Sequence, residues 1–331
     1  GVYLGWRGKA FWGASSFPAV LWNWASFPTR KATAHRIGSE DSAELLADLE
    51  ASWRNARTRR PQAPRPSRFV VVGHSFGTAV VYGGLSRLLA ERRTRLVEGG
   101  IDAAEFGDLV LLVNPAIEAS LIFPFEQESR KYNAMLTRNQ EADFHPILAV
   151  LTSEGDGATR YAFPLGRTTT TIFQRFREEN PPGYPEPQHF QRKAARVAAG
   201  HFEPFLEFLL CAPNEKPAAN LLTCTRSAAT SSSRAQDDGV EWQEPETMQL
   251  AEIRDSQSAA AAFQRGDRAD LPFSTSTLFH TSPGPITPYP VIRVDKRLIA
   301  GHNDIFTDWF APFLVEFVSV WSKPIPSSCT P

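Results

Sequence analysis

The stretch that decides the fold is Phe69-Val70-Val71-Val72-Gly73-His74-Ser75-Phe76-Gly77-Thr78-Ala79-Val80. It begins as a short apolar run typical of a buried strand and continues as a helical pattern. The Gly-x-Ser-x-Gly between them predicts a turn so tight that Ser75 takes a strained backbone conformation, while Gly73 and Gly77 let the strand and the helix approach each other. The Ser75 hydroxyl is therefore expected at the carboxyl edge of a sheet, at the start of a helix. The backbone N–H of Phe76 is the natural first donor to an oxyanion.

Further elements of the same kind follow along the chain. Residues 109–113 and 147–151 are apolar runs rich in Val, Ile and Leu, which predict fully buried parallel strands. Residues 42–53 and 78–91 carry apolar residues at helical spacing. A last strand at 291–294 precedes an aromatic-rich amphipathic helix that we expect from Phe306 to Trp321. Alternating strands and helices predict an α/β fold, with a mostly parallel sheet and helices on both faces.

The segment Gly73-His74-Ser75-Phe76-Gly77 resembles the nucleophile turn of the α/β-hydrolase superfamily, in its lipase and esterase branch. The resemblance covers residues 1–164 and 291–325. In that family the nucleophile, the acid and the histidine follow in this order along the chain, with the acid after the seventh strand and the histidine after the eighth. The resemblance implies that Asp156 is the acid and His302 the general base. It implies no metal and no organic cofactor.

Competing residues remain for each role. Glu154 and Glu118 are alternative acids. His74 neighbours Ser75, but its side chain should point away from that hydroxyl, and we assign it to substrate binding. Of the remaining histidines, His201 and two others in the middle of the chain could at most line a pocket.

The first residues, Val2-Tyr3-Leu4-Gly5-Trp6-Arg7-Gly8, could be the third strand of the same family, whose following loop supplies the second oxyanion donor, but they more closely resemble the fourth strand. On that reading the first three strands and the loop with the second oxyanion donor are missing from this chain. Trp6 is a second candidate for the substrate site.

The middle of the chain has a different amino-acid composition. Residues 165–290 are rich in Pro, Thr, Ser and Gln and predict a partly irregular, cap-like insertion. The hydrolase core would then comprise residues 1–164 and, after the insertion, residues 291–331 with the last strand and helix.

The amino-acid composition argues against some classes of function. The formal net charge of −1 argues against a nucleic-acid partner, and no apolar run is long enough to predict a transmembrane segment. A basic run from Arg54 to Arg68 indicates a solvated loop. Of three cysteines, Cys211 and Cys224 could bridge a short loop, although free thiols in a reducing compartment are the simpler expectation. No signal peptide is visible, which slightly favours the cytoplasm as the expected location.

The expected activity is hydrolysis of a small-molecule or lipid-like carboxylic ester through an acyl-enzyme. Thioesterase, amidase and acyltransferase activities use the same triad. A hydrolase-like binding module without catalysis is the alternative from another class.

Overall fold

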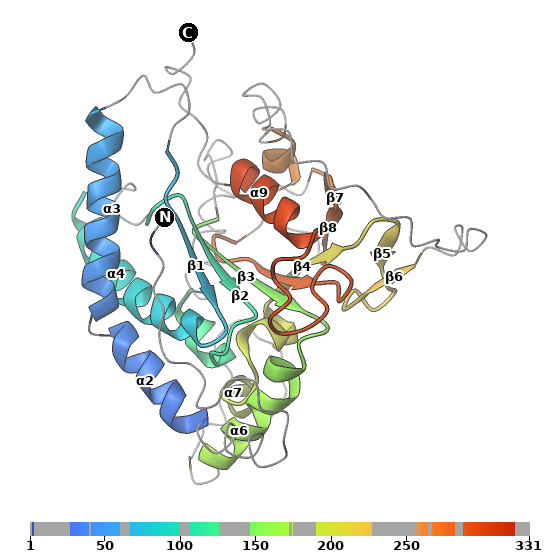
Figure 1. Cartoon of the computed structure of the whole chain (residues 1–331), viewed down its shortest axis with the longest axis horizontal. Coiled ribbons are helices and arrows are strands. Elements are labelled where there is room, and N and C mark those ends of the chain that lie inside the picture. The colour runs from blue at the N-terminus through green and yellow to red at the C-terminus, as the bar shows by residue number, and fades with distance from the viewer. Residues whose placement is uncertain are drawn as a thin grey trace.

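A seven-stranded sheet runs through the computed structural model of the chain (Figure 1). The structure describes residues 2, 27–39, 41–59, 67–99, 106–125, 146–171, 174, 190–226, 256, 258–263, 267–281 and 287–321. The helices among them include α2 (Phe27–Ser39), α3 (Asp41–Arg59), α4 (Gly77–Gly99), η2 (Ala158–Ala162), α6 (Phe163–Thr170), α7 (Phe190–Ala194), η3 (Ala199–His201), η4 (Glu203–Phe205) and α9 (Phe310–Trp321). The strands are β1 (Val70–His74), β2 (Leu109–Val113), β3 (Leu148–Ser153), β4 (Leu206–Cys211), β5 (Glu215–Pro217), β6 (Cys224–Arg226), β7 (Asp270–Phe273), β8 (Ser276–His280) and β9 (Val291–Val294).

The sheet is mostly parallel, as the sequence predicted. Its strand order is β1-β2-β3-β9-β4-β8-β7. The four pairs from β1 to β4 are parallel, and the two pairs that include β8 are antiparallel. Every residue of β2, β3 and β9 is buried, which explains why these strands read as continuous apolar runs.

Helices cover both faces of the sheet, and alternate strand residues point to opposite sides. Val110, Leu112 and Val150 pack with residues of α3 and α4 on one face. Leu111 and Leu151 pack on the other face with the aromatic side of α9. In Figure 1 the helices α2, α3 and α4 accordingly lie on one side of the sheet and α9 on the other. The parallel strands therefore all end at one edge, where the connecting loops gather their side chains.

Two expected helices have different bounds in the structure. The helix α3 runs on to Arg59, so the start of the basic run is helical rather than a loop. The helix α9 begins at Phe310, and Phe306 lies before it with 85% of its surface exposed. The cause is Thr307, whose hydroxyl accepts the N–H of Phe310 at 3.0 Å and so caps the helix.

The segment 165–290 is not simply a cap-like insertion. It supplies β4, β8 and β7, which extend the main sheet beyond β9. The apolar residues Phe208, Leu209 and Leu210 lie within the stretch interpreted as an insertion, but they form part of the sheet and are fully buried in it. An apolar run of this length does not by its periodicity distinguish a cover from a central strand.

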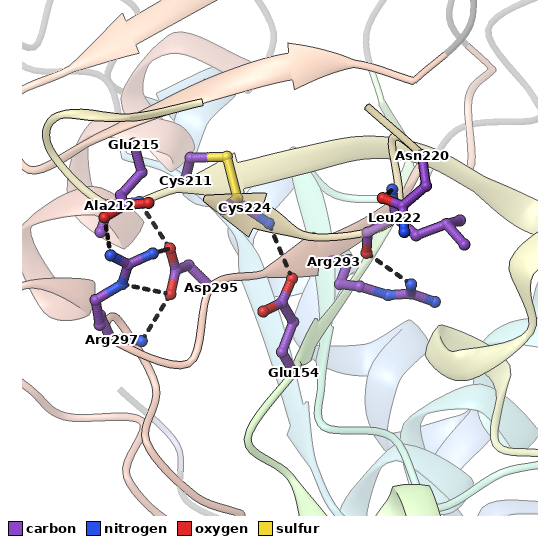
Figure 2. Close-up of a disulfide and its surroundings, with 10 residues drawn as sticks. All are labelled: Glu154, Cys211, Ala212, Glu215, Asn220, Leu222, Cys224, Arg293, Asp295 and Arg297. Carbon is purple, nitrogen blue, oxygen red and sulfur yellow. Dashed lines mark hydrogen bonds and ion pairs between the residues drawn. A yellow bond between two sulfur atoms is a disulfide. The ribbon is translucent and has the colours of Figure 1, made fainter. Parts of the chain in front are cut away.

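A disulfide joins Cys211 at the end of β4 to Cys224 at the start of β6 (Figure 2). This corrects the expectation of free thiols. The bond fastens the β5–β6 hairpin to the main sheet, and polar contacts surround it. Arg293 of β9 donates to the carbonyl of Leu222 at 2.8 Å, while Glu154 after β3 accepts the N–H of Cys224 at 3.3 Å (Figure 2).

Within the described residues β1 is an edge strand, and Val72 is 53% exposed. The strand expected at residues 3–8, including Trp6, lies outside the described residues. None of the described helices combines the length and apolar character needed to cross a bilayer.

Candidate active site

Ser75 lies on a sharp turn between β1 and α4. Its φ of 56° is in the left-handed region, which costs a residue with a side chain about 1–3 kcal/mol. The surroundings hold this conformation: the Ser75 N–H donates to the carbonyl of Val113 at 3.2 Å, and the Ser75 carbonyl accepts the N–H groups of Thr78 and Ala116, each at 3.1 Å. A Cβ on Gly73 would lie 3.0 Å from the Cα of Thr78, so only glycine fits there without displacement. The turn therefore has the strained geometry that the sequence predicted.

His302 lies in the loop between β9 and α9 and contacts both other expected residues. Its Nε2 is 2.7 Å from the Ser75 Oγ, and its Nδ1 is 2.9 Å from Oδ2 of Asp156. An ionised carboxylate can only accept hydrogen bonds, so Nδ1 carries the proton of a neutral ring. Nε2 is then the acceptor for the Ser75 hydroxyl. Three groups that are 81 and 146 residues apart along the chain thus form one hydrogen-bonded row.

Asp156 is fully buried in the loop after β3. Its Oδ1 accepts the N–H groups of Ala158 at 2.9 Å and Thr159 at 3.1 Å, and its Oδ2 accepts the Thr159 hydroxyl as well as His302. Burial alone would raise the pKa of Asp156. The hydrogen bonds and charge of His302, together with the donors of Thr159, outweigh burial and lower this pKa below its ordinary value. Asp156 is therefore a carboxylate at neutral pH.

The backbone carbonyl of His302 is held by two side chains. His74 Nε2 donates to it at 2.7 Å and Asn114 Nδ2 at 3.0 Å. Asn114 follows β2 with a φ of 45°, and its Oδ1 accepts the N–H of Ser153 at 2.9 Å. The ends of β2 and β3 and the histidine loop are thereby joined at one side chain.

His74 therefore has a second role besides the one that we assigned to it. Its ring lies 5.1 Å from the ring of His302. Burial lowers the pKa of His74, so its ring is neutral and Nε2 is the protonated nitrogen that donates to the carbonyl. Sequence reasoning assigned His74 to substrate binding, whereas this contact orients the loop that carries His302.

The remaining sequence-predicted residues lie as follows. Phe76 directly follows Ser75 and packs against a small cluster of Ala116, Phe163 and Ala198. Glu154 accepts from Cys224 and not from His302. Glu118 is buried and pairs with Lys31 and, at 2.6 Å, with Arg167. Neither alternative acid contacts the histidine.

Three residues at the site were not found from the sequence: Asn114, Thr159 and His201. Asn114 stands directly after a predicted strand, so its place at the carboxyl edge was a usable signal. His201 was left among residues that could line a pocket, but its Nε2 lies 3.0 Å from the Thr159 hydroxyl that donates to Asp156. No motif surrounds it.

Within the described part of the chain, no three His, Cys, Asp or Glu side chains are grouped as ligands for a metal ion. Comparison with family models, with curated proteins and with solved structures found no match to this chain.

Proposed function

We propose that the chain hydrolyses carboxylic esters through a covalent acyl-enzyme on Ser75. The observation that carries this proposal is the unbroken row of hydrogen bonds, in which His302 lies 2.7 Å from the Ser75 hydroxyl and 2.9 Å from the Asp156 carboxylate. A hydroxyl, a neutral imidazole and a buried carboxylate in this order are the groups that nucleophilic attack on a carbonyl carbon requires.

The reaction would proceed in two halves. Ser75 Oγ attacks the carbonyl carbon while its proton passes to His302 Nε2; the ester C–O bond then breaks, and the imidazolium gives that proton to the departing alcohol. A water molecule next attacks the acyl group and gives a proton to Nε2, and Ser75 Oγ leaves with it. Asp156 stabilises the imidazolium that forms in both halves and keeps the proton on Nδ1.

The charge that develops on the carbonyl oxygen needs a hydrogen-bond donor. In this proposal the donor is the backbone N–H of Phe76, at the turn that leads into α4. The start of α4 supports this role, because the aligned peptide dipoles of a helix carry partial positive charge at its N-terminus.

Labelling with a fluorophosphonate probe tests the proposal, because such probes react with activated serines. We expect one label per chain, lost in Ser75→Ala and kept in Ser86→Ala. Ser86 is the matched control, a serine of α4 whose hydroxyl donates to the carbonyl of Gly83. Hydrolysis of p-nitrophenyl acetate should fall by several orders of magnitude in Ser75→Ala and His302→Gln. Substituted thioester and anilide substrates in the same assay measure the preference among acyl compounds.

Two results would contradict the proposal. One is a label that survives Ser75→Ala. The other is a folded wild-type chain that neither labels nor hydrolyses any of these substrates, which would favour the non-catalytic binding module.

A further inference from the structure

Besides its hydrogen bond to His302, Asp156 takes part in a second row of hydrogen bonds, formed by Thr159 and His201. The Thr159 hydroxyl donates to Asp156 Oδ2, and His201 Nε2 lies 3.0 Å from the same hydroxyl. His201 belongs to η3, more than forty residues further along the chain, so it reaches the acid only through the folded structure.

The direction of these hydrogen bonds is fixed by their chemistry. A threonine hydroxyl has one hydrogen, and this hydrogen is directed at the Asp156 carboxylate, which has none to give. At the contact with His201 the hydroxyl must therefore accept, so Nε2 of His201 is the protonated nitrogen. The imidazole N–H donates to the hydroxyl and the hydroxyl donates to the carboxylate, an arrangement in which each bond strengthens the next.

His201 is neutral over the pH range in which such a site would work. Burial, followed by the charge of Arg293, lowers the pKa of His201 to about 4. Three charged groups face it: Arg293 from β9, Asp156 from the acid loop and Arg160 from η2. The only one of them that raises the pKa of His201 is Asp156.

The backbone around His201 is held closely against the core. The N–H of Ala199 donates to the carbonyl of Ile117 at 3.0 Å, and the backbone N–H of His201 donates to the carbonyl of Ala198 at 2.9 Å. Gly200 lies on the side chain of Thr152 in β3, where a Cβ would come within 1.6 Å of the Thr152 hydroxyl oxygen. The position of the imidazole is thus set by the same strand that leads to Asp156.

We propose that His201 is a positioning residue for the triad, which acts through the Thr159 hydroxyl to hold the Asp156 carboxylate in place as the acceptor for His302. This inference rests on the proposed ester hydrolysis for its kinetic consequences, although the hydrogen bonds exist whatever the reaction. His201 itself touches neither Ser75 nor the reacting atoms.

Removing the hydrogen bonds that Thr159 and His201 contribute should change the charge on the Asp156 carboxylate in a defined direction. In Thr159→Val the Asp156 carboxylate loses a donor, and in His201→Leu the Thr159 hydroxyl remains but donates less strongly. In both variants the carboxylate keeps more of its charge for His302, so it stabilises a positive ring there more strongly. The acid limb of the kcat/KM profile should then move to higher pH by roughly half a unit, while the loosened geometry lowers kcat/KM about tenfold. A residue that served only the fold would not move the acid limb.

The experiment compares matched variants of the full chain. His201→Leu removes the donor, and His201→Gln keeps an N–H near the position of Nε2. Thr159→Val and Thr159→Ser make the same comparison at the hydroxyl, and they replace the first pair if His201→Leu does not fold. His280→Leu is the control, because Nε2 of His280 also makes a part-buried hydrogen bond, to the carbonyl of Phe263 at 2.8 Å. His74, whose ring lies against that of His302, is unchanged in every variant.

We expect His201→Leu and Thr159→Val to show both effects, and His201→Gln, Thr159→Ser and His280→Leu to stay close to wild type. The double variant His201→Leu/Thr159→Val should equal Thr159→Val alone, since His201 acts through that hydroxyl. The proposal is overturned if the kcat/KM profile of His201→Leu matches that of His280→Leu. It is also overturned if the effect of the double variant equals the sum of the effects of His201→Leu and Thr159→Val.

The proton NMR resonance of His302 Nδ1–H, which reports its bond to Asp156, should shift in the same variants. That measurement needs no activity, so a failure of the proposed hydrolysis is distinguished from a failure of this inference.

Discussion

The His201 imidazole should make the folded chain less stable as the pH falls below neutrality. Its pKa is about 4 in the folded state, against 6.5 for an ordinary histidine. Between these values the unfolded chain binds more protons, so its free energy falls relative to that of the folded chain. The stabilisation is complete above pH 6.5 and is lost progressively down to about pH 4. At 1.36 kcal/mol for each pKa unit, a difference of about 2.5 units corresponds to roughly 3 kcal/mol.

Other groups titrate in the same range, so the measurement is a difference between two proteins. The histidines with a lowered pKa in the folded state also include His35, His74 and His280. His201→Gln leaves these groups in place and removes only the one titration. The assay is urea unfolding followed by tryptophan fluorescence, for both proteins, at a series of pH values from neutrality down to pH 4.

The free energy of unfolding of wild type minus that of His201→Gln should be constant above pH 6.5 and should fall by roughly 3 kcal/mol towards pH 4. A difference that stays flat over this range would show that His201 is not buried as a neutral ring. A difference that rises as the pH falls would show that the folded state stabilises its charged form, and would refute the reasoning.

Three further predictions concern the surroundings of the site. Gly200→Ala should destabilise the chain by about 1–3 kcal/mol, measured as a lower Tm, because its Cβ would overlap the Thr152 hydroxyl; an unchanged Tm would contradict this packing. Cys224→Ser should remove about 3 kcal/mol of stability, and a reducing agent should lower the Tm of wild type but not of the variant. Asn114→Leu should lower kcat for ester hydrolysis about tenfold, because the carbonyl of His302 loses one of its two donors; steady-state kinetics with an unchanged kcat would argue against that role.

The parts of the fold that could be predicted are those in which local pattern and burial agree. The runs at 109–113 and 291–294 become β2 and β9 with the same bounds, because both are buried on two faces and need apolar residues throughout. The turn at Ser75 could be predicted, and Gly73 is needed there as expected, since a Cβ on it would crowd Thr78. The same role predicted for Gly77 is wrong, because a Cβ on Gly77 would meet no atom within 4 Å. The meeting of Asp156 with His302 followed from the resemblance, which supplied the order of the residues along the chain.

Other features depend on contacts between distant segments and left no local pattern. The strand β4 could not be separated from the cap-like insertion predicted at 165–290, because its neighbours β9 and β8 come from positions more than sixty residues later. The pairing of Cys211 with Cys224 depends on how the β5–β6 hairpin folds back onto β4. His201 could not be recognised because its partner Thr159 is 42 residues away and forms the contact only in the assembled structure.

The contact of Gly200 with Thr152 has a consequence for protein engineering. The polypeptide between α6 and β4 cannot be exchanged as an independent module, because it carries Gly200, which lies on Thr152, and the imidazole bonded to Thr159. A chimaera that replaced this segment would also disturb the hydrogen bonds to the Asp156 carboxylate. Under the proposed hydrolysis, lost turnover in such a chimaera would reflect this disturbance, and grafts should retain residues 198–201.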